Sequence, residues 1–165
     1  MPKSVFYSFH FDNDVFRVQQ VRNMGALDGN PPVTANEWES IKRKGAAAVQ
    51  NWIQDNMAYK KCAIVLIGTQ THERPWVQYE IKKAWNDGRG VLGVYIHNLN
   101  CPKNGKCRQG INPFSQFKIG TTNMSYIVPC YDPTPTDAYN SIKSNIDLWV
   151  DDAIRIRGLY SGTAS

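Results

Sequence analysis

Six consecutive apolar residues, Cys62–Ile67, place the strongest constraint on the fold. A run of this length is typical of a β-strand that is covered on both faces, since a strand with one face in water alternates apolar and polar residues. A second run, residues 91–97, is almost wholly apolar. Between the two runs, Pro75 suits the first position of a helix and Asp87-Gly88 suits its end. Two buried strands joined by a helix predict a parallel sheet.

The rest of the chain continues this alternation of strands and helices. We predict strands over residues 4–11 and 125–130, helices over 15–24 and 136–154, a long helix that Asn36 caps and that extends to Ile53, a loop over 25–35 and an irregular segment over 98–123. The predicted fold class is therefore α/β, a three-layer, flavodoxin-like doubly wound parallel sheet. Residues 1–158 are expected to form one domain, and residues 159–165 are expected to be a disordered tail.

The composition argues against several classes of protein. With 165 residues, 42% of them apolar, the chain can bury one good core. No apolar run approaches the roughly 20 residues of a membrane span and no secretory leader is readable, so we expect a cytoplasmic protein that binds no membrane. The net charge of +5 comes from scattered basic residues, which do not predict a nucleic-acid groove. The spacing of Cys101 and Cys107 is not that of a zinc site, so no metal is expected.

Glu80 is the most informative single residue. At about 100° per residue, it lies about 40° from Trp76 on the helix that Pro75 begins, inside the arc that also holds Val77 and Ile81. The acid is therefore predicted to face the interior. Buried carboxylates are rare unless they are paired or hydrogen-bonded, so Glu80 has either a structural partner such as a lysine or arginine, or a chemical role.

The carboxyl ends of parallel strands are where such sheets bind ligands. Residues 8–12, residues 68–71 and the helix start at Trp76 would meet there, so Glu80 would border a cleft. Ser8 and Thr69 could offer hydroxyl groups, and Trp76 or Phe9 could form an apolar wall. No GxxxxGK[ST] sequence is present, which argues against a mononucleotide kinase. A GxGxxG match occurs at residues 88–93, but it leads into a predicted strand instead of following one and opening a helix, which argues against an ordinary Rossmann dehydrogenase.

Several segments, taken in order, resemble the TIR-like domains of bacterial Thoeris antiphage systems. They are VFYSFH at 5–10, CAIVLIGTQT at 62–71, WVQYEI at 76–81, and GVYIH at 93–97 followed by NPF at 112–114. The resemblance covers residues 5 to about 130. In wider TIR domains the first segment matches an FxSY-type box and the third a WCxxE box. Here Val77 replaces the cysteine, a change that affects packing more than chemistry.

The resemblance implies an NAD⁺-consuming enzyme in which Glu80 is the essential catalytic residue. Such proteins release nicotinamide, and Thoeris relatives make a cyclic ADP-ribose isomer or a related nucleotide that signals to a separate effector protein. NAD⁺ would be the substrate, no further cofactor would be needed, and the protein would self-associate on activation. The residues expected to bind NAD⁺ are Ser8, Phe9, His10, Thr69, Trp76 and Tyr79. Two alternatives stay open: a non-catalytic TIR adaptor, and a nucleoside deoxyribosyltransferase whose carboxylate attacks the sugar directly.

Overall fold

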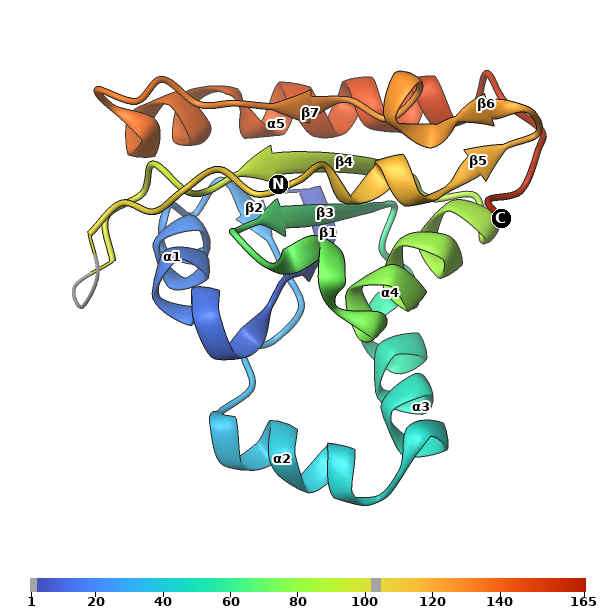
Figure 1. Ribbon diagram of the computed structural model, residues 1–165, viewed down its shortest axis with the longest axis horizontal. Helices are drawn as coiled ribbons and strands as arrows, with labels where there is room; N and C mark the ends of the chain where they lie inside the picture. The colour runs from blue at the N-terminus through green and yellow to red at the C-terminus, as the bar shows by residue number, and fades with distance from the viewer. Residues whose placement is uncertain (1–2, 102–104) are drawn as a thin grey trace.

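The computed structural model describes residues 3–101 and 105–165. At its centre lies a five-stranded, wholly parallel sheet in the order β2-β1-β3-β4-β7 (Figure 1). The strands are β1 (Lys3–Ser8), β2 (Leu27–Asp28), β3 (Cys62–Ile67), β4 (Gly90–Tyr95) and β7 (Cys130–Tyr131). The register pairs Ile67 with Tyr95, so β3 and β4 end side by side, and it pairs Ser8, the end of β1, with Val65, two residues before the end of β3.

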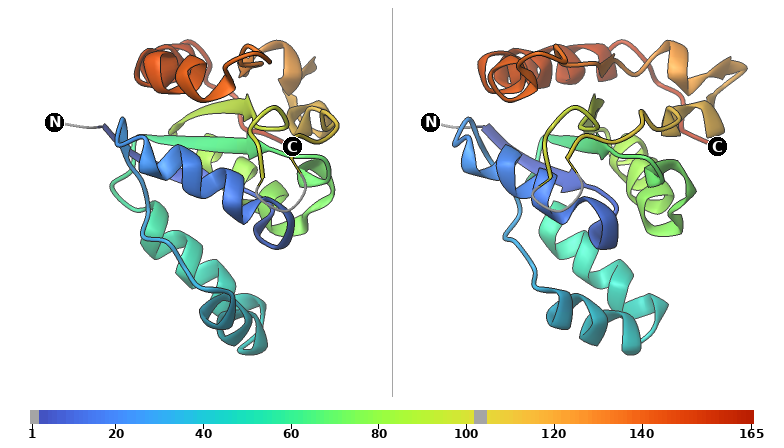
Figure 2. Two further views of the ribbon diagram at one scale, coloured as in Figure 1. Left: turned by 90° about the vertical axis from the view of Figure 1, so that its left-hand side faces the viewer. Right: turned by 60° about the vertical axis from the view of Figure 1, so that its left-hand side comes forward.

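Helices cover both faces of this sheet, which confirms the three-layer α/β prediction (Figure 2). On one face α3 (Ala46–Met57) and α4 (Pro75–Asn86) pack against a cluster that includes Phe6, Val65 and Ile67. On the other face α1 (Phe11–Asn23) and α5 (Ala138–Arg157) pack against a cluster that includes Ile64 and Leu92. Alternate residues of β3 therefore enter opposite cores, which is why the whole strand is apolar. No described helix is long and apolar enough to cross a membrane.

The first helix starts earlier than predicted. We expected a strand as far as residue 11 and a helix from residue 15, whereas β1 ends at Ser8 and α1 begins at Phe11. His10, with extended backbone angles, is the N-cap, and its carbonyl accepts the Asp14 amide at 3.0 Å. The acidic residues that looked like a cap before the helix instead form its first turn, where the helix dipole favours negative charge.

The long second helix of the prediction is two helices. Between α2 (Ala35–Arg43) and α3, Gly45 adopts a φ of 102°, which a residue with a side chain rarely adopts. The chain turns at this glycine, and α2 projects away from the sheet (Figure 1). Trp38 of α2 and Trp52 of α3 meet edge to face, 5.6 Å apart, so the turn brings two aromatic rings together that one straight helix would have separated.

The segment after β4 also differs from the prediction. Part of the predicted irregular segment, 102–104, lies outside the described residues. Farther along this segment, Pro113–Gln116 forms a 3₁₀ turn. After the turn, β5 (Lys118–Ile119) and β6 (Thr122–Asn123) form a small hairpin. The predicted strand over 125–130 is wrong, because Met124–Tyr126 is a 3₁₀ turn and only Cys130–Tyr131 joins the sheet. Ile127 and Val128 are buried against the core in this irregular conformation, which explains the misleading apolar pattern.

The C-terminal tail makes contacts that its sequence did not predict. Ala164 is buried and pairs as an isolated bridge with Ile119 of β5. Its amide donates to the Asn86 side chain at 2.8 Å, and Ser165 exchanges two backbone hydrogen bonds with Lys118. A short apolar residue among polar neighbours does not produce a recognisable pattern, so this docking is visible only in the folded chain.

Candidate active site at the start of helix α4

Glu80 faces the interior, as the helical spacing predicted. The buried positions of α4 include Val77, Glu80, Ile81 and Ala84. Glu80 is only 7% exposed. The hydroxyl of Ser8, at the end of β1, donates a hydrogen bond of 2.6 Å to Oε1 of Glu80. Among the described residues, the partner of the acid is therefore a neutral hydroxyl group from a neighbouring strand, rather than the lysine or arginine of a structural ion pair.

Burial raises the pKa of Glu80 from its ordinary value of 4.5 to about 8, while the hydrogen bond from Ser8 acts in the opposite direction. Desolvation disfavours the charged form, and a neutral hydroxyl compensates for only part of this cost. At neutral pH the free protein therefore holds Glu80 mainly as the neutral acid. A carboxyl group with such a pKa changes charge readily when a charged ligand arrives next to it.

A cavity of about 180 Å³ opens beside Glu80. Its walls come from the β1–α1 connection, the segment after β2, helices α2 and α3, and the first turn of α4. The aromatic residues that line it are Tyr7, Phe9, Phe11, Trp38, Trp52 and Trp76. Its charged and imidazole side chains are His10, Asp12, Arg22, Lys42, Arg74 and Glu80. A hollow that combines aromatic walls with convergent polar groups is the usual form of a small-molecule site.

The structure gathers most, but not all, of the residues expected to bind the substrate. Phe9, His10 and Trp76 line the cavity beside Glu80. Ser8 is not among the lining residues, but its hydroxyl donates a hydrogen bond to Glu80. Thr69 is not among the lining residues, and its hydroxyl instead donates to the Arg108 carbonyl at 3.1 Å. Tyr79 is also absent from the lining; it packs edge to face on Trp76 with ring centres 5.6 Å apart. Direct contacts of Thr69 and Tyr79 with NAD⁺ stay predictions that this geometry does not support.

Sequence reasoning missed the contribution of helix α2. Trp38 and Lys42 reach the cavity because the turn at Gly45 folds α2 back over α3. The glycine in the middle of an otherwise helical pattern was the available signal, since glycine weakens a helix interior. Asn30 was missed as well: its side chain accepts the Tyr7 amide at 2.8 Å and so attaches the segment after β2 to the end of β1.

Two comparisons identify the family. The family model of the Thoeris protein ThsB, TIR-like domain, matches residues 6–101. The chain belongs to this TIR-like family. A Bacillus cereus (strain MSX-D12) protein named "Putative cyclic ADP-D-ribose synthase ThsB1" is 34% identical over 119 residues, which cover 69% of this chain and 62% of the relative. The chain thus matches less than two thirds of that relative's length.

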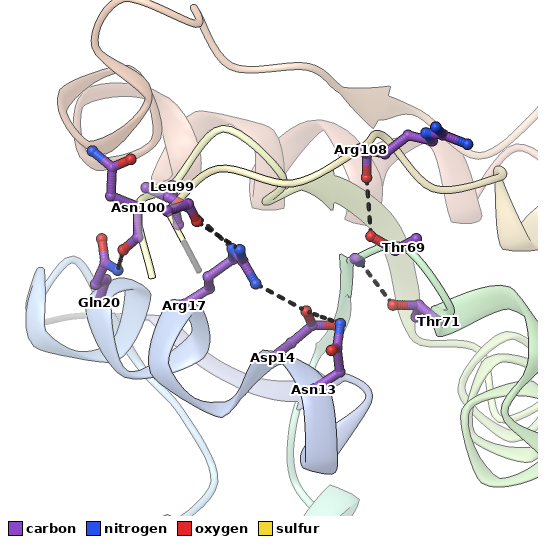
Figure 3. Close-up of polar contacts among 11 residues, drawn as sticks. Asn13, Asp14, Arg17, Gln20, Thr69, Thr71, Leu99, Asn100 and Arg108 are labelled. Carbon is purple, nitrogen blue, oxygen red and sulfur yellow. Dashed lines mark hydrogen bonds and ion pairs between the residues drawn. The ribbon is translucent and has the colours of Figure 1, made fainter. Parts of the chain in front are cut away.

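The region that matches the TIR-like family contains both Glu80 and Ser8, and it runs from β1 through β4. It also contains a second buried acid, Asp14 on α1, beside Arg17 (Figure 3). Arg17 donates to the carbonyls of Leu99, at 3.1 Å, and Gly105, at 2.8 Å, so it ties α1 to the segment that follows β4. Among the described residues, no group of three or more histidine, cysteine, aspartate or glutamate side chains could hold a metal ion.

Proposed function

We propose that the protein cleaves the bond between nicotinamide and ribose in NAD⁺ and joins the freed ribose carbon to another atom of the ADP-ribose part. The product would be nicotinamide and a cyclic ADP-ribose isomer or a related nucleotide, which serves as an antiphage signal for a separate effector. The observation that carries this proposal is Glu80, buried on the wall of an aromatic cavity with a hydroxyl as its partner. Family membership and the printed name of the Bacillus cereus relative support the same chemistry.

One carboxyl group is enough for this reaction. Nicotinamide in NAD⁺ already carries a positive charge, so the electron pair of the broken bond leaves with a neutral ring and no acid has to protonate it. Positive charge then collects on the ribose as an oxocarbenium-like ion, as in glycoside hydrolysis. The Glu80 carboxylate stabilises this charge, and a preorganised group of this kind contributes roughly 2.7–4 kcal/mol, or about 10²–10³ in rate.

The ionisation of Glu80 follows from the charge of the substrate. In the free protein, burial keeps the pKa of Glu80 at about 8. A pyridinium cation that enters the pocket favours the carboxylate and so lowers this pKa. The hydrogen bond from Ser8 favours the carboxylate as well. Substrate binding and formation of the catalytic charge are therefore coupled.

The size of the cavity fits one end of the dinucleotide. A cavity of about 150 Å³ accepts a benzene molecule, and this cavity measures about 180 Å³. It therefore has room for one six-membered ring with a substituent, close to Glu80. Trp76 and Phe9 offer faces on which a flat cationic ring can stack.

A TIR adaptor without catalysis is less well supported, because an adaptor surface does not require an acid on the wall of a cavity. The decisive experiment is nucleotide mass spectrometry on phage-infected cells that carry the wild-type protein, Glu80→Gln or Glu73→Gln. Glu73 is exposed and lies outside the cavity lining, which makes it a matched control. We expect nicotinamide and a new nucleotide with the wild-type and Glu73→Gln proteins and neither with Glu80→Gln.

The same nucleotide from the Glu80→Gln protein would reject Glu80 as the catalyst. Purified protein incubated with NAD⁺ and, separately, with deoxynucleosides distinguishes the remaining alternative. Release of free base from deoxynucleosides would indicate a deoxyribosyltransferase, whereas release of nicotinamide from NAD⁺ supports the proposal.

A further inference from the structure

Two polar atoms on the cavity wall lack a hydrogen-bond partner among the described residues. They are Nδ1 of His10 and Nε of Arg74, and both atoms are buried. His10 as a whole is 7% exposed, and both residues line the cavity beside Glu80. Buried polar groups in folded proteins nearly always have a partner, so two such atoms in one cavity indicate a place where a polar ligand binds.

Arg74 is a cation that the rest of the described chain leaves unneutralised. Its guanidinium group makes one side-chain hydrogen bond, to Oε1 of Gln70 at 3.4 Å, and it forms no ion pair with a described carboxylate. Arg22, which also lines the cavity, forms no ion pair with a described carboxylate either, but neutral groups of the protein already hold its guanidinium. Its guanidinium donates to the Asn30 carbonyl and lies over the Tyr7 ring, 5.2 Å from its centre. Arg74 is therefore the arginine that is available to a ligand.

The start of α4 adds further positive potential at the same place. Arg74 is the N-cap, Pro75 has no amide hydrogen, and the first helical hydrogen bond runs from Gln78 to the Arg74 carbonyl. The amides of Trp76 and Val77, which lie between, are among the first-turn donors that a helix cannot satisfy internally. These residues line the cavity, and the N-terminus of a helix attracts anions.

A second cation comes from helix α2. Lys42 lines the cavity with its ammonium group 5.7 Å from the centre of the Trp38 ring. Lys42 also forms an ion pair of 2.8 Å with Glu39, and the Lys42 side chain is one third exposed. A partly solvated lysine that already has a partner is a weaker ligand for an anion than an arginine fork, which matches two phosphate oxygens at once.

We propose that Arg74, together with the first turn of α4 and Lys42, binds the diphosphate of the dinucleotide while the nicotinamide ribose reaches Glu80. This assignment rests on the proposed function. It places the two charged parts of NAD⁺ against opposite charges of the protein, the cationic ring beside the acid and the anionic diphosphate beside the guanidinium. His10 adds no positive charge to this region, because burial and the nearby Arg74 lower its pKa and so favour the neutral imidazole. Arg74 thereby orients the substrate and selects ligands that carry a diphosphate.

Calorimetric titration with two ligands tests this assignment. ADP-ribose carries the diphosphate without nicotinamide, and nicotinamide riboside carries the cationic ring without phosphate. We expect Arg74→Gln to weaken ADP-ribose binding about tenfold or more, as expected for the loss of a charged hydrogen bond, and to change nicotinamide riboside binding less than twofold. Lys42→Gln should weaken ADP-ribose binding by a smaller factor. Arg43→Gln, which removes the same charge from an exposed neighbour of Lys42 outside the cavity, should change neither.

Equal weakening of both ligands by Arg74→Gln, or no weakening of ADP-ribose binding, would overturn the assignment. So would a wild-type protein that binds neither ligand. Thermal melting verifies that each variant is folded, and Arg74→Lys provides a second variant: it should retain part of the affinity because it keeps the charge and loses the fork. These measurements need no turnover. A protein that binds ADP-ribose through Arg74 yet releases no nicotinamide from NAD⁺ would refute the proposed function and leave the diphosphate site standing.

Discussion

Two buried acids lie near the carboxyl ends of the central strands, and they have opposite surroundings. Glu80 borders a cavity and is hydrogen-bonded by a neutral hydroxyl. Asp14 is fully buried in packed structure, 3.6 Å from the Arg17 guanidinium, and a side chain on Gly68 would collide with its carboxylate (Figure 3). Burial raises the pKa of both, Glu80 to about 8 and Asp14 to about 6, and the positive charge of Arg17 opposes the shift at Asp14.

The difference shows that burial of an acid does not by itself identify a catalytic residue. Asp14 and Arg17 form a structural pair, because Arg17 also holds two backbone carbonyls of the segment after β4. Glu80 borders a cavity and forms no ion pair with a described lysine or arginine, so its charge is available to a ligand. Parallel experiments on the two acids and their partners test this distinction.

The largest effect is expected from Arg17→Met. This change leaves Asp14 buried without its cation and removes the donors to Leu99 and Gly105. Breaking a buried ion pair on one side typically costs about 3–5 kcal/mol, so the free energy of unfolding measured in urea should fall by about that amount. Arg43→Met, on the exposed side of α2, is the control and should change it by less than about 0.5 kcal/mol. A loss below about 1 kcal/mol for Arg17→Met would mean that the pair is not structural.

Next in size is the pH dependence of stability at Glu80. The folded protein binds this proton more tightly than the unfolded chain, whose glutamate titrates near 4.5, so the free energy of unfolding of the wild type should decrease as pH rises from about 4.5 to about 8. Glu80→Gln lacks this titration and should be more stable than the wild type at pH 9 by about 2–4 kcal/mol, with little difference at pH 4. Equal pH profiles for the two proteins would show that the acid is well solvated.

A smaller effect is expected from Ser8→Ala. The Ser8 hydroxyl favours the carboxylate form of Glu80, so its loss raises the pKa of Glu80 further. For the wild type, kcat/KM for nicotinamide release should increase about tenfold per pH unit up to about pH 8, because this ratio reports ionisation in the free enzyme. For Ser8→Ala the increase should shift to higher pH, and kcat/KM at pH 7 should be about tenfold lower.

The matched control for this experiment is Ser4→Ala. Ser4 lies on the same strand but accepts a hydrogen bond from Lys60. Ser4→Ala should leave the pH profile of kcat/KM unchanged. A Ser8→Ala protein whose activity drops equally at all pH values would show that the hydroxyl contacts the substrate instead of tuning Glu80.

The parts of the molecule that could be predicted from sequence are those set by local patterns. The strand Cys62–Ile67 and the helix Pro75–Asn86 appear where they were expected, because burial on both faces and the 3.6-residue period act over short stretches. The inward direction of Glu80 follows from the same period. Once the β-strands are parallel, the approach of Ser8 to Glu80 is also expected, since both lie at the carboxyl edge of the sheet.

The remainder depends on contacts between distant segments. The aromatic wall contributed by Trp38 requires the reversal at Gly45, and a positive φ there cannot be inferred from helical spacing. The tail docks through Ala164 onto a hairpin that only the folded chain brings near it. Thr69 follows its strand as Ser8 follows β1, yet the neighbouring segment at Arg108 takes its hydrogen bond. Equivalent positions in sequence thus have different roles, because their neighbours in space differ.

Thr69 provides the smallest and last test of the two regions. Its hydroxyl donates an exposed hydrogen bond to the Arg108 carbonyl (Figure 3). Arg108 belongs to the segment after β4, which Arg17 also holds through the Leu99 carbonyl. Thr69→Ala should therefore lower the free energy of unfolding by about 0.5–1 kcal/mol, the usual contribution of one neutral hydrogen bond, and change KM for NAD⁺ by less than about twofold. If KM instead increased about tenfold while stability stayed constant, Thr69 would contact the substrate as the sequence predicted. The NAD⁺ site would then extend from the Glu80 cavity into the region of Asp14, and the separation between a catalytic and a structural acid would no longer hold.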